Sequence, residues 1–79
     1  MQTPEADQKL ANILRDALDL PASADVSGLS RENCPEWDSL RHVKIILDVQ
    51  KAFGVRFAAA DVIRISSYGA LRAELAQKA

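Results

Sequence analysis

Apolar residues recur at helical spacing in three parts of the chain, and the clearest repeat runs from Glu36 to Phe53. At about 100° per residue, one face of this segment is apolar and the opposite face is charged. The apolar face comprises His42, Ile45, Ile46, Val49 and Phe53. The charged face comprises Arg41, Lys44, Asp48 and Lys51. The pattern therefore predicts a central helix with its first face in the core and its second face in solvent.

A second apolar line on the same helix diverges from the core face. It consists of Leu40, Val43 and Leu47, at spacings of three and four residues. Two interpretations of this line are open. The helix is either buried on two sides, or it presents an exposed apolar strip to a partner protein.

The first helix is predicted over residues 4–18, with Thr3 as its cap and Pro4 at its first position. Its buried face comprises Leu10, Ile13, Leu14, Ala17 and Leu18. We expect this helix to supply one wall of the core.

Two more helices are predicted near the end of the chain. A short one over residues 58–64 would bury Val62 and Ile63, and a last one would follow a cap at Ser66 or Ser67. The buried face of the last helix comprises Tyr68, Leu71 and Leu75. The expected fold is an all-α four-helix bundle with three main helices and a short third one.

The segments between the helices are predicted to be loops. Residues 21–37 have no sustained period and form an unusually long first loop, which we expect to cross from one end of the first helix to the other. Val26, Leu29 and a packed Cys34 would hold it against the core. Gly54 would end the central helix in a left-handed cap.

Length and composition limit the possible functions. The 79 residues make a single domain with too little interior to enclose a conventional active site. The net charge of -1 argues against a nucleic-acid partner. No apolar run is long enough for a membrane span, no signal peptide is visible, and one cysteine excludes an intramolecular disulfide. These features favour a monomeric cytoplasmic protein.

The candidate functional group in this sequence is the hydroxyl of Ser39. Asp38 or Ser39 caps the central helix, so this hydroxyl lies at the positive end of the helix dipole, where a phosphate would be favoured. A nucleophile–base pair of Ser39 with His42 is disfavoured, because the serine lies at the cap and the histidine on the core face. We expect no catalytic residues and, with one histidine and one cysteine, no metal site.

The triplet Asp38-Ser39-Leu40, the helix ending at Phe53 and the following run 54–57 (Gly-Val-Arg-Phe) resemble the acyl carrier protein family. The resemblance extends from Leu10 to about Leu75. That family often has a glycine two residues before the aspartate, where this chain has Glu36. A subset of carriers with a Trp-Asp-Ser-Leu start is more similar.

The resemblance implies a phosphoprotein in which Ser39, beside Asp38, carries covalent 4′-phosphopantetheine from coenzyme A. A phosphopantetheinyl transferase would attach this group, and its thiol would hold an acyl cargo as a thioester. A loading ligase and a downstream transferase or synthase would then be partners, as in fatty acid or polyketide biosynthesis. The chain would present substrate without itself being an enzyme.

The charges of the central helix differ from those of fatty-acid carriers, whose corresponding helix is strongly acidic. Asp48 is the only acid between residues 39 and 60, which implies a specialised pathway rather than housekeeping fatty-acid synthesis. The expected docking residues are Leu40, Arg41, Val43, Lys44 and Leu47. One alternative is a carrier for a D-alanyl or other aminoacyl group. An alternative of another class is a small helical interaction protein without a prosthetic group, in which Ser39 is only a cap.

Overall fold

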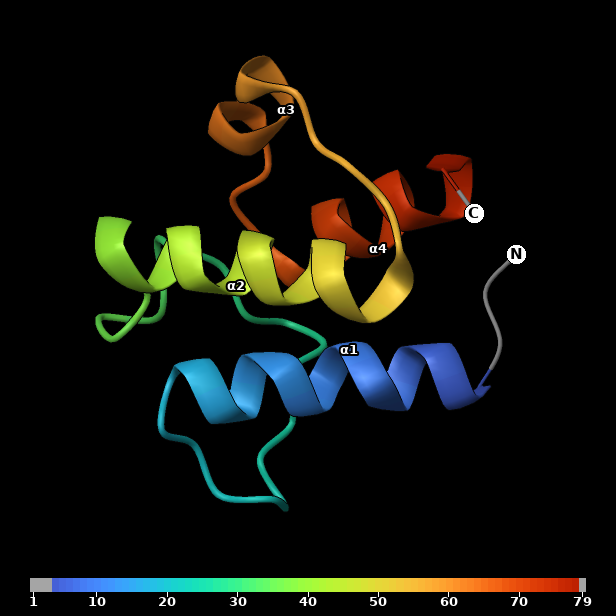
Figure 1. Cartoon of the computed structure of the whole chain (residues 1–79). Helices are drawn as coiled ribbons and strands as arrows, with labels where there is room; N and C mark the ends of the chain where they lie inside the picture. The colour runs from blue at the N-terminus through green and yellow to red at the C-terminus, as the bar shows by residue number, and fades with distance from the viewer. Residues whose placement is uncertain (1–3, 79) are drawn as a thin grey trace.

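The computed structural model describes residues 4–78, and within this range it contains four α-helices and no strand. These are α1 (Pro4–Ala17), α2 (Ser39–Phe53), α3 (Ala59–Arg64) and α4 (Tyr68–Lys78). Figure 1 shows α1 and α2 side by side, with α3 and α4 beyond α2. The predicted all-α class, the short third helix and the long first loop are confirmed. The predicted cap at Thr3 lies outside the described residues.

A single apolar core joins α1, α2 and α4. Its fully buried centre comprises Leu10, Leu14, Leu18, Ile45, Val49, Ile65 and Leu71. The loop before α2 contributes Val26, Cys34 and Trp37. The predicted buried faces of the three main helices are therefore largely correct, although Ile13 and Phe53 are only half-buried at the edge of the core.

Local chemistry sets the ends of α2. Asp38 is the N-cap residue, and its carboxylate accepts a hydrogen bond from the backbone N–H of Arg41 at 2.9 Å. Gly54 adopts the left-handed conformation, with φ of 66°, and its N–H donates to the carbonyl of Gln50. Of the two predicted caps for the last helix, Ser67 is the one used, since its Oγ accepts from the backbone N–H of Ala70 at 3.1 Å.

α1 and α2 are antiparallel, so the first loop begins and ends at the same end of the helix pair (Figure 1). Asp19, just after α1, pairs with Arg41 near the start of α2 at 3.6 Å. At the opposite end, Lys9 Nζ donates to the carbonyl of Ala52 at 2.8 Å. The expectation that the loop crosses the length of the first helix was therefore wrong. Its length instead allows it to reach α4, where Ser30 forms an antiparallel bridge with Ser67.

The expected burial of Ile63 in α3 was also wrong. Its side chain is 81% exposed, and Val62 is only partly buried. The helix is held mainly by polar contacts rather than by an apolar face. Asp61 pairs with Arg64 at 2.8 Å, and Arg64 also pairs with Glu74 of α4.

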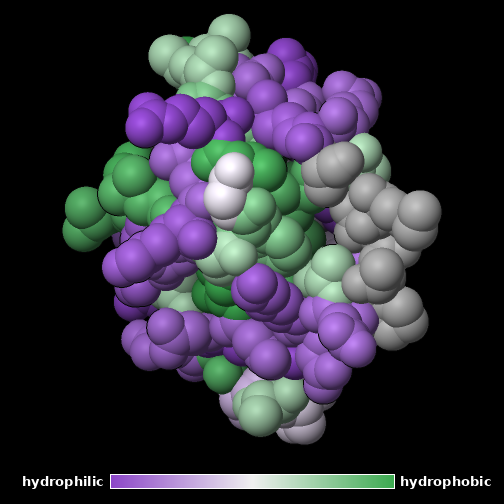
Figure 2. Space-filling view, turned by 45° about the vertical axis from the view of Figure 1, so that its right-hand side comes forward, coloured by the Kyte–Doolittle hydropathy of each residue, from purple (hydrophilic) through white to green (hydrophobic). Residues whose placement is uncertain are grey.

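The surface of the molecule has both hydrophilic and hydrophobic areas. Figure 2 shows hydrophilic side chains around most of one face and hydrophobic surface gathered toward its middle and left side. Scattered apolar surface is normal for a domain of this size. Among the described residues, the large apolar side chains that are most exposed are Leu40, Val43, Leu47 and Ile63.

Candidate functional site

Ser39 is the first residue of α2 and its side chain is exposed. Its Oγ lies 3.3 Å from Nη2 of Arg31, which donates a hydrogen bond to it. The predicted position of Ser39, in solvent at the entrance of a helix, is confirmed. The hydroxyl is accessible to an external enzyme and faces a positively charged group.

Asp38 has a structural role at the same place. Because its Oδ1 accepts from the Arg41 N–H, one of its carboxylate oxygens is directed at the first turn of α2. The first turn itself contains no acidic residue. The partial positive charge of the remaining first-turn N–H groups is therefore opposed only by the cap.

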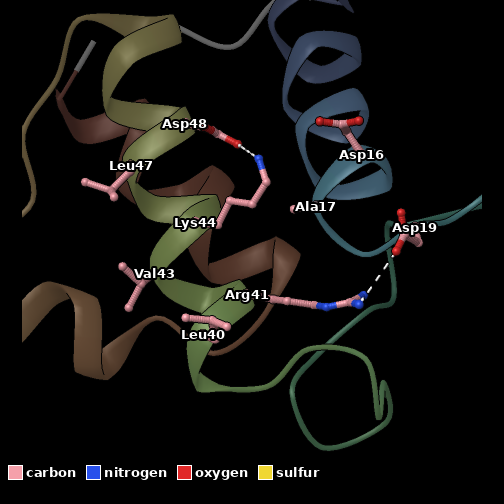
Figure 3. A pocket seen from close by; sticks show the side chains of 9 residues that line it. All are labelled: Asp16, Ala17, Asp19, Leu40, Arg41, Val43, Lys44, Leu47 and Asp48. Carbon is pink, nitrogen blue, oxygen red and sulfur yellow. Dashed lines mark hydrogen bonds and ion pairs between the residues drawn. The ribbon is translucent and has the colours of Figure 1, made fainter.

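The second apolar line of α2 is exposed. Leu40 is 81%, Val43 50% and Leu47 57% accessible, whereas the adjacent Ile46 is 4% accessible. In Figure 3, Val43 and Leu47 point away from α1. The interpretation of α2 as buried on two sides is therefore excluded, and an exposed apolar strip of Leu40, Val43 and Leu47 begins directly beside Ser39.

The two basic residues expected to take part in docking are paired within the chain. Figure 3 shows Arg41 directed toward Asp19 and Lys44 toward Asp48. The Lys44–Asp48 distance is 2.9 Å, and the hydrogen bond that Lys44 Nζ donates to the Asp48 carboxylate raises the pKa of Lys44. These pairs reduce the net charge around the apolar strip without making it acidic.

A shallow groove lies between the end of α1 and the first half of α2 (Figure 3). Its apolar part consists of the strip residues and Ala17, and its remaining residues are charged, among them the pairs Arg41–Asp19 and Lys44–Asp48. Its lining comprises Asp16, Ala17, Asp19, Leu40, Arg41, Val43, Lys44, Leu47 and Asp48. All five predicted docking residues line this groove, although Val43 and Leu47 lie on the side of α2 away from α1.

His42 is buried and does not face Ser39 as a base. Its Nδ1 accepts from Trp37 Nε1 at 3.0 Å, and its Nε2 lies 2.8 Å from the carbonyl oxygen of Val62. An indole nitrogen can only donate, so Nδ1 is unprotonated and Nε2 carries the hydrogen that Val62 accepts. Both ring nitrogens are thus engaged in structural hydrogen bonds, as expected for a core histidine.

Two structural features are absent from the part of the chain that the structure describes. Over residues 4–78, no group of three or more histidine, cysteine, aspartate or glutamate side chains could hold a metal ion. Within the same range, no helix has both the length and the apolar character that crossing a bilayer requires.

Sequence reasoning missed Arg31. It lies in the loop, eight residues before Ser39, and nothing in its local sequence distinguishes it from other surface arginines. Its place beside Ser39 depends on the pairing of the loop with the start of α4, which only the folded chain shows.

Comparison of the chain with models of protein families and with curated proteins finds no match to either. Function is therefore inferred from the geometry around Ser39 and α2.

Proposed function

We propose that this chain is a carrier protein that holds an acyl group as a thioester on 4′-phosphopantetheine attached to Ser39. The observation that carries the proposal is the exposed Ser39 hydroxyl at the first position of a 15-residue helix. A serine that served only as a cap would direct its oxygen at the first-turn N–H groups. Here Asp38 fills that role, and the Ser39 hydroxyl is left to solvent and Arg31.

The residues around Ser39 fit a phosphodiester. The start of α2 favours negative charge, because the N–H groups of its first turn have no partner within the helix. Arg31 adds a full positive charge within hydrogen-bonding distance of Oγ. The attached group would supply a flexible arm with a terminal thiol that holds the cargo. The chain's own contribution is to hold the attachment point in solvent on a rigid helix.

The exposed strip beside Ser39 supports docking of partner enzymes. Leu40, Val43 and Leu47 together provide an apolar contact area next to the attachment point. Tethering then raises the concentration of the cargo near a docked enzyme. The proposed partners are a phosphopantetheinyl transferase, a loading ligase and a downstream transferase or synthase.

The charge of α2 favours a specialised pathway over housekeeping fatty-acid synthesis. With Arg41, Lys44 and Lys51 against Asp48, this helix cannot steer a basic partner surface over long range. We further propose that the protein acts as a cytoplasmic monomer. Mass analysis of cargo captured on the native protein distinguishes an acyl group from the alternative D-alanyl or other aminoacyl group.

Intact-mass analysis tests the proposal. After incubation with coenzyme A and a broad-specificity phosphopantetheinyl transferase, the protein should gain the mass of one phosphopantetheine. Ser39→Ala should abolish the gain, and Ser23→Ala, at another exposed serine, should leave it unchanged.

A second candidate, a small helical interaction protein, is supported by the exposed apolar strip, which needs no prosthetic group to bind a partner. Absence of any mass gain, under conditions that fully modify a known carrier, would favour that candidate.

A further inference from the structure

Arg31 reaches from the loop before α2 to the one hydroxyl that the proposed function requires. Its Nη2 donates to Ser39 Oγ at 3.3 Å, a contact between a full positive charge and a neutral oxygen. We propose that Arg31 binds the phosphodiester formed when Ser39 is modified. This inference rests on the proposed function and adds a residue that sequence reasoning did not find.

The backbone of Arg31 is held firmly. Its N–H donates to the carbonyl of Ser66 at 2.9 Å, and the N–H of Tyr68 donates to the carbonyl of Leu29 at 3.0 Å. These bonds flank the bridge between Ser30 and Ser67. The guanidinium therefore extends from a segment fixed against α4, which lowers the entropy cost of holding it beside Ser39.

Among residues 4–78, no carboxylate forms an ion pair with Arg31. Over residues 4–78, Arg41, Arg64 and Arg72 each form an ion pair with an acidic side chain, whereas Arg31 forms none. A guanidinium that lacks an anionic partner and faces a modifiable hydroxyl would gain that partner on modification. The surrounding structure does not have to change for the pair to form.

The chemistry of the two groups is complementary. A phosphodiester carries one negative charge, and its two non-bridging oxygens are attached to the phosphorus that would be bonded to Ser39 Oγ. Arginine presents planar N–H donors that match two such oxygens, which a lysine cannot do. The carboxylate of Asp38 adds a second negative charge to the same short stretch, and the Arg31 cation would offset part of their repulsion.

The first test follows the wild-type protein by NMR. The arginine Nε–H resonances are recorded before and after complete modification, and mass spectrometry confirms the product. The Arg31 resonance should shift clearly on modification. The resonance of Arg56 serves as the control, because it follows the far end of α2, about 20 Å along the helix from Ser39. A shift of Arg31 no larger than that of Arg56 would overturn the inference.

The second test compares melting temperatures of unmodified and modified protein. For wild type and Arg56→Gln, modification should change the melting temperature by the same amount. For Arg31→Gln that change should be less favourable by about 2–4 °C, the size expected for one exposed ion pair in a small domain. The difference should shrink in 0.5 M salt. Equal changes in all three proteins would contradict a contact between Arg31 and the phosphate.

The two proposals fail in different ways. If no protein gains mass on Ser39, both the carrier function and the Arg31 contact are wrong. If all gain mass while the Arg31 resonance and the melting temperatures behave as in the control, the carrier function stands and only the Arg31 contact is wrong.

Discussion

The indole N–H of Trp37, two residues before the exposed Ser39, donates to Nδ1 of His42 across 3.0 Å inside the core. The other ring nitrogen of His42 bonds to the carbonyl of Val62 in α3. One buried imidazole thus joins the end of the first loop, α2 and α3. The segment that carries Ser39 is held from its interior side, while its outer side stays open to solvent.

Replacement of Trp37 by phenylalanine should destabilise the fold. The variant removes the donor to His42 Nδ1 and leaves a buried acceptor unsatisfied, which costs about 1–3 kcal/mol. Urea unfolding followed by circular dichroism measures the loss. If the unfolding free energies of wild type and Trp37→Phe agree within about 0.3 kcal/mol, the Trp37–His42 hydrogen bond contributes nothing to stability.

Replacement of Leu47 by aspartate should separate docking from stability. Because Leu47 is 57% exposed, the change should alter the unfolding free energy by less than about 0.5 kcal/mol. It should also slow modification by the transferase and loading by the partner ligase, since the apolar contact is lost. The neighbouring Ile46→Ala is the control for burial and should cost about 2–5 kcal/mol. A large loss of stability in the Leu47 variant would contradict its exposed position.

Replacement of Asp38 by alanine should weaken the start of α2. The substitution removes the acceptor for the Arg41 N–H and should cost about 0.5–2 kcal/mol in unfolding free energy. Asp38→Asn keeps a side-chain oxygen for the same bond and should stay close to wild type. Thermal unfolding of wild type, Asp38→Ala and Asp38→Asn measures the loss of stability. Equal losses in both variants would assign the effect to charge rather than to capping.

Asp61 should make stability depend on acidic pH. The backbone N–H of Ala58 lowers the pKa of Asp61 below its ordinary value of 3.8, and Arg64 and Lys78 act in the same direction. The carboxylate therefore binds protons less readily in the folded chain. Its contribution to stability is present above about pH 4 and is lost as the pH falls through the folded pKa.

The matching measurement is the melting temperature between pH 2.5 and pH 7 for wild type and Asp61→Asn. The wild-type protein should lose more on acidification, because the variant cannot titrate at residue 61. Parallel profiles would show that Asp61 contributes no pH dependence.

Periodicity predicts burial correctly where burial depends on the position of a residue around its own helix. The core face of α2 follows from the 100° repeat, whereas the repeat left open whether Leu47 is buried, and the structure shows it exposed beside a buried Ile46. The start of α2 could be predicted to within one residue because Asp38 and Ser39 are both good caps. The exposed position of Ser39 follows directly from that start.

Features set by contacts between distant segments could not be predicted. Arg31 lies beside Ser39 because the loop pairs with the start of α4, and no local pattern encodes that pairing. The antiparallel order of α1 and α2 brings distant residues such as Arg41 and Asp19 together, and no local pattern encodes it. The short helix α3 is held by the Asp61–Arg64 ion pair and by the hydrogen bond between the Val62 carbonyl and His42. Ile63 lies on its exposed side, so a prediction from apolar character alone was wrong.

The Ser30–Ser67 bridge also bears on the order in which the chain folds. Its two partners are separated by more than thirty residues, so closing it carries a loop-closure entropy cost that the local contacts within a helix do not have. The helices, whose backbone contacts are local, should therefore form first. Arg31 would reach its place beside Ser39 only once the loop has paired with the start of α4.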